Sequence, residues 1–296
     1  MTNNPYFLPE RDPSNCAITL LSNTVGYDNL PINVFDIPEQ EDYEVLFCND
    51  VFDNDNQYGL SIIKSEDDKV IFLNSDFYGN SFDDVIPNDT KRRHCRFTLA
   101  HELGHCTIPE HKDLSLRNTL LNENNTHYKK YNFQREYEAN VFAAELLIPS
   151  VAIKNIYSYG KNFKEIVANL SNKFDASVMA SALRTANLMN DSICICLQIN
   201  KQSKKIINFR YSNAFKDYKR GLFIEKNTEP YSGSVANSLI KGTTICTYQY
   251  YNNPSDWFPN FYGSQEAKLH EWSFDMGENI ITFLELIDTS DYNLYF

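Results

Sequence analysis

The sequence predicts an α+β fold with two domains. Strand-like runs within 58–74 are joined by a short charged link, which indicates a β-hairpin. Residues 133–148 are rich in Ala, Leu and Glu and contain neither Gly nor Pro, which favours a helix. From residue 193 onward, alternating apolar stretches predict a second group of strands. We therefore expect one domain at 1–190 and another at 191–296.

Further elements of the first domain follow from local patterns. In order, they are a short helix at 17–21, apolar runs at 30–35 and 43–47, strands at 58–63 and 70–74, a polar loop with some helix at 111–131, and helices at 163–173 and 176–188. Pro149 is expected to end the long helix. In the second domain we expect strands at 193–199, 206–211, 243–250, 269–274 and 279–286, and a helix at 232–241. Trp257 and Trp272 are interpreted as core residues.

Composition and charge limit the classes of function. The chain of 296 residues carries a formal net charge of −12, which repels nucleic acid and anionic membranes and suits a basic protein partner. Direct binding of nucleic acid is therefore not expected. The seven cysteines follow no disulfide spacing, which favours reduced thiols in a cytoplasm. The polar N-terminus and the lack of a long apolar run predict neither a leader peptide nor a membrane span.

The stretch His101-Glu102-Leu103-Gly104-His105 carries the clearest chemistry. On a helix, residues four apart lie on one face, so both histidines can offer a ring nitrogen to one metal ion. Glu102 lies next to them and can reach a water molecule on that ion. Two histidine ligands and a glutamate base are the signature of zinc-dependent peptidases. The pattern predicts Zn²⁺ first, and the same kind of ligand set also accepts Mn²⁺.

A catalytic zinc ion needs a third protein ligand, and three residues compete for that role. His111 has the spacing of the HExxHxxGxxH motif, but Ile108 and Pro109 stand where that motif needs a glycine for a sharp turn. Glu136 and Glu138 lie on the following predicted helix. A carboxylate there can face the two histidines across a pair of packed helices.

The residue one turn further along distinguishes the two glutamates. Glu136 is followed by Asn140, whose side chain can accept the N–H of a metal-bound histidine and so orient it. Glu138 is followed by Phe142, which cannot do this. The residues thus favour Glu136 as the third ligand and a solvated or ion-paired Glu138.

Two linked motifs resemble a known family. The segment from Arg96 to His105 is RFTLAHELGH, and the segment from Glu136 to Pro149 is EYEANVFAAELLIP. Both closely resemble the ImmA/IrrE family of metallo-endopeptidases, whose pattern is RFTxAHExGH followed by ExxA[ND]xFAAxLLMP. The departure at Ile148, where Met is usual, is conservative. The resemblance covers about residues 30–190.

The resemblance implies a zincin-like metalloprotease core with a small β-sheet and active-site helices. It also implies a C-terminal α+β domain, which in some members is similar to GAF. Carried over residue by residue, it implies metal ligands His101, His105 and Glu136, a catalytic base Glu102, and a ligand-orienting Asn140. Family members typically act on a helix-turn-helix repressor and switch on a mobile-element or stress regulon, so a protein substrate of that kind is expected.

Substrate contacts are less well defined by the sequence. A protein donor should stabilise the oxyanion of the reaction, and His111, His127 and Tyr128 are the candidates. One hairpin strand within 58–74 can pair with an extended substrate by edge addition.

Two segments are considered as binding sites for nucleic acid or for an acidic peptide. Residues 163–188 have the outline of a helix-turn-helix, but they contain few basic side chains, which favours packing helices over a DNA reader. The basic cluster, just ahead of a predicted helix, consists of Lys91, Arg92, Arg93 and Arg96. A helix N-terminus disfavours cations, so an acidic partner is expected. Internal candidates are Asp83, Asp84 and Asp89; an acidic substrate segment is the alternative.

Two classes of function therefore remain for this sequence. The first is a cytoplasmic metallo-endopeptidase that cleaves a repressor or a related regulator. The second is a metal-bound transcriptional regulator or interaction protein without proteolysis. Glu102 separates them, because a protein that only binds has no need of a base at that position.

Overall fold

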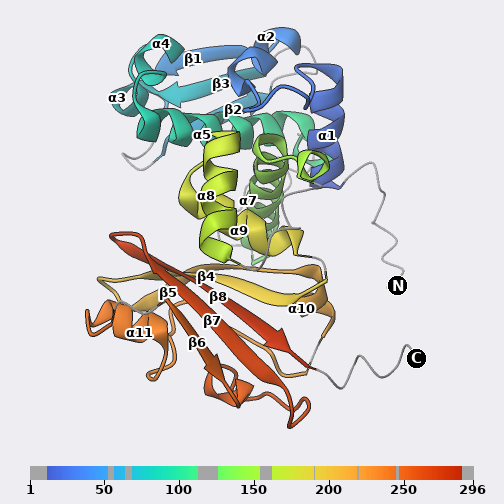
Figure 1. Cartoon of the computed structure of the whole chain (residues 1–296). Coiled ribbons are helices and arrows are strands. Elements are labelled where there is room, and N and C mark those ends of the chain that lie inside the picture. Colours follow the sequence, from blue (N-terminus) through green and yellow to red (C-terminus); the bar gives the residue numbers. More distant parts are fainter. Residues whose placement is uncertain are drawn as a thin grey trace. The chain divides into compact units, whose positions relative to one another are not determined.

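The computed structural model describes residues 12–52, 57–63, 69–112, 126–153, 162–189, 191–218, 220–244 and 247–288, with the backbone alone at 112 and 126–132. Backbone contacts divide the chain into two compact units. The first is Met1–Asn155 with Asn172–Ser177, and the second is Ile156–Ser171 with Val178–Phe296. Both units combine helices with a sheet (Figure 1). None of the described helices has the length and apolar character that a membrane span requires.

The first unit begins with helices and a small sheet. Its elements are α1 (Pro13–Asn23), η2 (Val34–Asp36), α2 (Ile37–Gln40), β1 (Glu44–Cys48), β2 (Gly59–Ile63), β3 (Lys69–Asn74), α3 (Ser75–Tyr78), α4 (Phe82–Val85), α5 (Asp89–Thr107), η3 (Pro109–Lys112), α7 (Thr126–Leu147) and η4 (Ser150–Ala152), where η is a 3-10 helix. The strand order is β1-β3-β2, with β1 parallel and β2 antiparallel to β3. The predicted hairpin is thereby confirmed.

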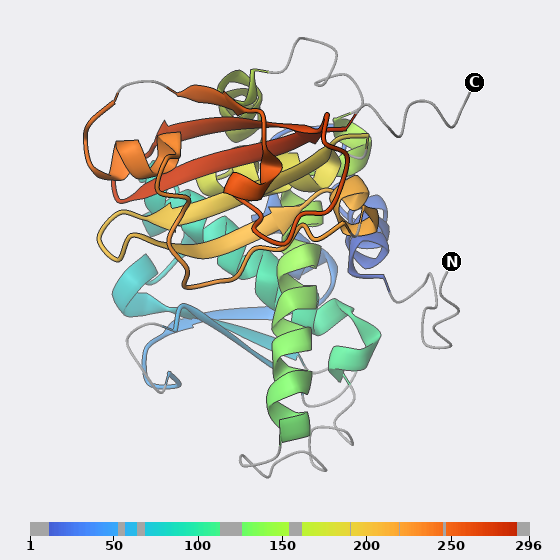
Figure 2. The same ribbon diagram turned by 90° about the horizontal axis from the view of Figure 1, so that it is seen from below.

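Helix α5 is the central element of the first unit. It packs along β2 and β3, and α7 packs against both α5 and α1 (Figures 1 and 2). Asn88 caps its N-terminus by accepting a hydrogen bond from Lys91 N at 3.0 Å. The helix ends at Thr107, just before Pro109. The segment at 111–131 was expected to be a loop with some helix, and its described parts are helical: η3 extends to Lys112 and α7 begins at Thr126. Residues 113–125 lie outside the described residues.

Close packing of α5 on α7 depends on small residues. A Cβ atom at Gly104 would lie 3.3 Å from Ala139 Cα and 3.1 Å from Phe142 Cδ1. Such distances are tighter than ordinary van der Waals contact. Gly104 and Ala139 therefore let α5 and α7 pack closely where the two sequence motifs lie, RFTLAHELGH on α5 and EYEANVFAAELLIP beginning on α7.

The second unit is built on one antiparallel sheet. Its elements are α8 (Phe163–Phe174, whose last three residues belong to the first unit), α9 (Val178–Leu188), β4 (Ile193–Asn200), β5 (Lys205–Tyr211), α10 (Asn213–Asp217), α11 (Val235–Ile240), β6 (Tyr248–Tyr251), η6 (Pro254–Asp256), β7 (Lys268–Asp275) and β8 (Asn279–Ile287). The strand order is β5-β4-β8-β7-β6. The strands match the expected ones, although β6 is shorter than the 243–250 of the sequence analysis.

The sheet of the second unit carries a hydrophobic core on each face. Trp257 lies in one core, and Trp272 packs against the other, so both belong to the core as expected. Glu271 is fully buried, yet it accepts hydrogen bonds from Ala236 N at 2.7 Å, from Ser273 Oγ at 2.7 Å and from Tyr251 Oη. A buried carboxylate with this many donors is a structural group.

Helix α9 contributes to the second unit. Ala182 and Ala186 are fully buried in one core cluster with Cys194 and Cys196 of β4. These contacts group α9 with the second sheet, whereas the sequence analysis grouped 163–188 with the first domain. The boundary near residue 190 stays a prediction about domains, as does the likeness of the second one to GAF.

The basic cluster lies within the first turns of α5 rather than ahead of it. Its main partner is Asp175, which accepts from Arg92 Nε and Nη2 at 2.7 and 2.9 Å and from Arg93 Nε at 3.0 Å. Arg96 is buried and donates to the backbone oxygens of Ile32 and Phe174 at 2.8 and 3.2 Å. The cluster therefore holds distant parts of the first unit together.

Of the expected acidic partners, one pairs with the cluster and another has a different partner. Asp89 does pair with Arg92 at 2.8 Å, but Asp84 accepts instead from Asn80 N at 2.8 Å. The sequence analysis missed Asp175 because it lies 83 residues from Arg92 in the chain. Its backbone has a φ of 47°, a left-handed conformation that Asp and Asn tolerate better than most residues.

We expect Asp175→Asn to lower the free energy of unfolding by about 2 kcal/mol at neutral pH, because it removes a carboxylate from hydrogen bonds to charged groups. The hydrogen bond from Arg92 holds the pKa of Asp175 to about 2, against the raising effect of burial. This is below the value of about 3.9 in an unfolded chain. The stabilisation is therefore present above pH ~4 and is lost as the pH falls towards 2.

Urea unfolding of wild type and variant over this pH range measures the effect. Asp83→Asn, at an exposed site, is the matched control and should change stability by less than about 0.5 kcal/mol. A difference for Asp175→Asn that did not shrink below pH ~4 would contradict the ion-pair explanation.

Candidate metal centre

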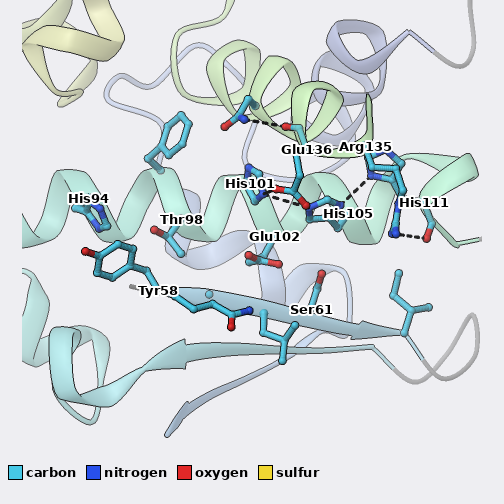
Figure 3. A pocket seen from close by; sticks show the side chains of 16 residues that line it. Tyr58, Ser61, His94, Thr98, His101, Glu102, His105, His111, Arg135 and Glu136 are labelled. Carbon is cyan, nitrogen blue, oxygen red and sulfur yellow. Dashed lines mark hydrogen bonds and ion pairs between the residues drawn. The ribbon is translucent and has the colours of Figure 1, made fainter. Parts of the chain in front are cut away.

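The candidate metal centre lies where α5 and α7 pack together. His101 and His105 project from one face of α5, one helical turn apart, and Glu136 reaches them from α7 (Figure 3). Metal-ligating atoms of these three residues all lie within 4.8 Å of one another. The structure thus brings together the three residues that the sequence analysis favoured.

The distances suit a small metal ion. His101 Nε2 and His105 Nε2 are 3.1 Å apart, and Glu136 oxygens lie 3.2 Å from the first nitrogen and 3.5 Å from the second. Ligand atoms of a tetrahedral zinc ion, with bonds of about 2.0–2.1 Å, are separated by roughly 3.3–3.4 Å. The donor set and its spacing therefore fit such an ion.

The protonation states of His105 and Glu136 also favour metal binding. Burial lowers the pKa of His105 to about 4, although Glu136 opposes the shift, so the imidazole keeps a free lone pair at neutral pH. Hydrogen bonds with His101 and then His105 hold the pKa of Glu136 well below its usual range. The side chain of Glu136 is 60% exposed, against 15% and 10% for the two histidines. The centre is thus open to water or substrate on the Glu136 side.

Asn140 supports His101. Its Nδ2 donates to the backbone oxygen of Glu136 at 2.8 Å, which fixes the amide, and its side chain also hydrogen-bonds with His101. Burial lowers the pKa of His101, but Glu136, Glu102 and Asn140 together raise it above its usual value. Asn140 therefore contacts the histidine that it was expected to orient.

His111 lies behind His105 and outside the group of metal-ligating atoms. Its Nδ1 is 3.0 Å from Nδ1 of His105, and its Nε2 is 3.1 Å from Oε2 of Glu138. Both ring nitrogens are therefore engaged away from the position of a third ligand or of an oxyanion donor. The side chains of the other two oxyanion candidates, His127 and Tyr128, lie outside the described residues.

Glu102 is buried between α5 and β2, facing Ser61 (Figure 3). The side chain and the backbone of Ser61 both hydrogen-bond with its carboxylate. A Cβ atom at Gly59 would lie 2.6 Å from Thr98 Cγ2 and 2.9 Å from Glu102 Oε1. Sequence reasoning missed both contacts, although a glycine inside a strand is a signal of close approach.

The centre opens into a pocket of about 530 Å³. One wall is β2 with the residues before it, and the other is the face of α5 that carries the two histidines. At the far end, His94 Nδ1 is 2.5 Å from Tyr78 Oη, and the Tyr58 ring meets His94 edge-on at 4.6 Å. The pocket thus runs from the metal ligands to an aromatic end.

Comparisons with known proteins identify one family and one similar fold. The model of the peptidase M78 family, described as the IrrE N-terminal-like domain, matches residues 85–185. No curated protein matches the chain. A solved structure of a Mycobacterium tuberculosis transcriptional regulator is similar, with a TM-score of 0.51 and 13% identity over 95% of this chain and 90% of that one. At this identity the likeness shows a shared fold.

We expect the purified chain to bind one divalent ion, zinc ahead of manganese, because its ligand set is two imidazoles and one carboxylate. His101→Ala and Glu136→Ala should each lose the ion. His270→Ala, in the second unit, is the control and should retain it. Elemental analysis by mass spectrometry gives the result. Retention of the ion by both site variants would refute this centre.

Proposed function

We propose that this chain, which belongs through residues 85–185 to the ImmA/IrrE family of metallopeptidases, is a metal-dependent endopeptidase that cleaves a regulatory protein. The observation that carries the proposal is the convergence of His101, His105 and Glu136 within 4.8 Å beside the buried Glu102. Two imidazoles and a carboxylate hold a metal, and an adjacent buried carboxylate adds a base.

The metal ligands and Glu102 have different roles in the proposed hydrolysis. A zinc ion held by His101, His105 and Glu136 supplies a Lewis acid, which acidifies water and polarises a carbonyl. Glu102 accepts the proton of the attacking water and returns it to the leaving amine. Burial raises the pKa of Glu102, although His101 and Ser61 oppose the shift. A raised pKa suits a carboxylate that must both take up and release a proton.

The substrate is proposed to bind as an added strand. β2 lies at the edge of its sheet in the order β1-β3-β2 and lines the pocket. An extended peptide pairing with this edge would pass along α5 with its backbone near the metal ligands. Gly59 and Ser61 lie on this strand and contact Glu102, which couples the position of the substrate to that of the base.

A helix-turn-helix repressor is the substrate that we propose, because family members typically act on such proteins. The net charge of −12 supports this choice, since a DNA-binding protein presents a basic surface. The similar solved structure carries the name of a transcriptional regulator, which fits a role in gene control. A cytoplasmic location follows for an enzyme that meets a repressor, and all six described cysteines are free thiols.

The alternative is a metal-bound regulator without proteolysis. Glu102 distinguishes it from a peptidase, because a side chain that only packs there would not need to be a buried acid. Burying an ionisable carboxylate is costly unless it has a function or full hydrogen bonding. The buried Glu102 therefore favours catalysis.

We expect Glu102→Gln to keep the metal and to abolish cleavage, because the amide has almost the same shape but cannot accept the proton. The test is co-expression with a helix-turn-helix repressor from the same genome, followed by mass spectrometry of the fragments. Cleavage of that protein by wild type and not by the variant supports the proposal. Equal cleavage by both would refute the role of Glu102, and a lack of cleavage by wild type would refute this substrate.

Gly59→Ala tests the position of Glu102 without changing its chemistry. The added methyl group would overlap Thr98 and Glu102, so the carboxylate must move. We expect kcat to fall about 100-fold while the metal content stays the same, as measured with a fluorogenic peptide containing the cleavage site. Ile62→Val on the same strand is the control and should match wild type. Wild-type kcat in Gly59→Ala would contradict the contact.

A further inference from the structure

We propose that Glu138 and His111 form a hydrogen-bond relay that holds the ring of His105 at its Nδ1 atom, so that the Nε2 atom faces the metal. This proposal rests on the metal centre of the proposed function. It assigns a positioning role to two residues that the sequence motifs do not include. His111 and Glu138 lie on different elements, η3 and α7, and meet behind the metal ligand.

The contacts form a continuous chain. Glu138 Oε2 lies 3.1 Å from His111 Nε2, and His111 Nδ1 lies 3.0 Å from His105 Nδ1. The His111 side chain is fully buried and that of Glu138 is 25% exposed. Water therefore has little access to replace either link.

The direction of each hydrogen bond follows from the ligand atom of His105. Its Nε2 atom lies 3.1 Å from His101 Nε2, at the proposed metal position. A neutral imidazole that binds a metal through Nε2 keeps its proton on Nδ1, so Nδ1 of His105 donates to Nδ1 of His111. Because Nδ1 of His111 accepts, its Nε2 atom carries the ring proton and donates to Glu138.

The carboxylate of Glu138 is held at both of its oxygens. His111 Nε2 lies 3.1 Å from Oε2. Gln134 Nε2 donates to the other carboxylate oxygen at 2.6 Å, which fixes its orientation. Arg135 donates to the backbone oxygen of His111 at 3.1 Å, which holds the η3 turn in place.

The two metal-binding histidines thus have different supports. His101 is oriented by the neutral amide of Asn140, whereas His105 is oriented through a second imidazole by a carboxylate. A negative charge at the end of the relay also makes the ligand nitrogen a better donor to the metal. The loss of such supports typically weakens metal binding about 10- to 100-fold.

The test compares zinc affinity in the full chain by competition with a chromogenic chelator. His111→Phe keeps the ring volume but removes both nitrogens, and we expect zinc affinity to fall about 10- to 100-fold. His111→Asn places an amide oxygen near the position of Nδ1, where it can accept from His105, and should recover most of the affinity. His270→Phe, in the second unit, is the control and should bind zinc as wild type does.

A second readout reports the tautomer itself. Long-range ¹H–¹⁵N spectra of the zinc-loaded wild type should show the His111 proton on Nε2, which faces Glu138, and a proton-free Nδ1 that accepts from His105. Melting temperatures of the metal-free variants show whether His111→Phe remains folded. If it does not, Glu138→Gln, which removes only the charge, takes its place with the same expected direction.

The outcomes separate the relay from the proposed function. Wild-type zinc affinity in a folded His111→Phe, or a His111 proton on Nδ1 in the zinc-loaded wild type, would overturn the relay and leave the peptidase proposal intact. A wild-type chain that binds no zinc would overturn both. Weaker binding by His111→Phe with recovery in His111→Asn supports the relay.

Discussion

The close contact of α5 with α7 at Gly104 is the constraint on which the rest of the site depends. The ligands come from two helices, so only helix packing sets the distance between Glu136 and the histidines. A Cβ atom at Gly104 would lie 3.3 Å from Ala139 Cα, and larger residues at either position would push the helices apart. Because Ala139 lies within one turn of Glu136, this contact also sets how close Glu136 lies to the two histidines.

Helix α7 organises the site through two neighbouring rows of side chains. Glu136 and Asn140, four residues apart, contact the two histidines of the proposed metal centre. Gln134 and Glu138, also four residues apart, contact each other, and Glu138 also contacts His111. Residues at this spacing lie one above the other on a helix. A single helix therefore carries one proposed ligand together with side chains that contact the other two or their support.

Local periodicity explains why part of this arrangement could be predicted. His101 and His105 share a helix face by their spacing alone, and Asn140 distinguished Glu136 from Glu138 by the same rule. The β2–β3 hairpin and the strands of the second sheet follow from apolar runs between turns. These features depend on residues that are close in sequence, where spacing determines geometry.

Contacts between residues far apart in the chain could not be predicted from local spacing. The hydrogen bonds of Ser61 with Glu102 depend on how β2 docks on α5. The partner of the basic cluster is Asp175, and no local pattern relates the two. His111 has the spacing of a ligand in another motif, but its position is set by Glu138 on α7. Each of these outcomes is decided by tertiary packing rather than by propensity.

The path of the chain through the two units limits how this protein can change during evolution. Residues Asn172–Ser177 belong to the first unit although the segments on both sides belong to the second. This short segment places Asp175 beside Arg92 and Arg93 of α5. A recombination event that joined residues 1–155 to a new partner would inherit the metal ligands and lose that carboxylate. Such a chimaera would keep the proposed active site but lack the ion pairs that hold the start of α5.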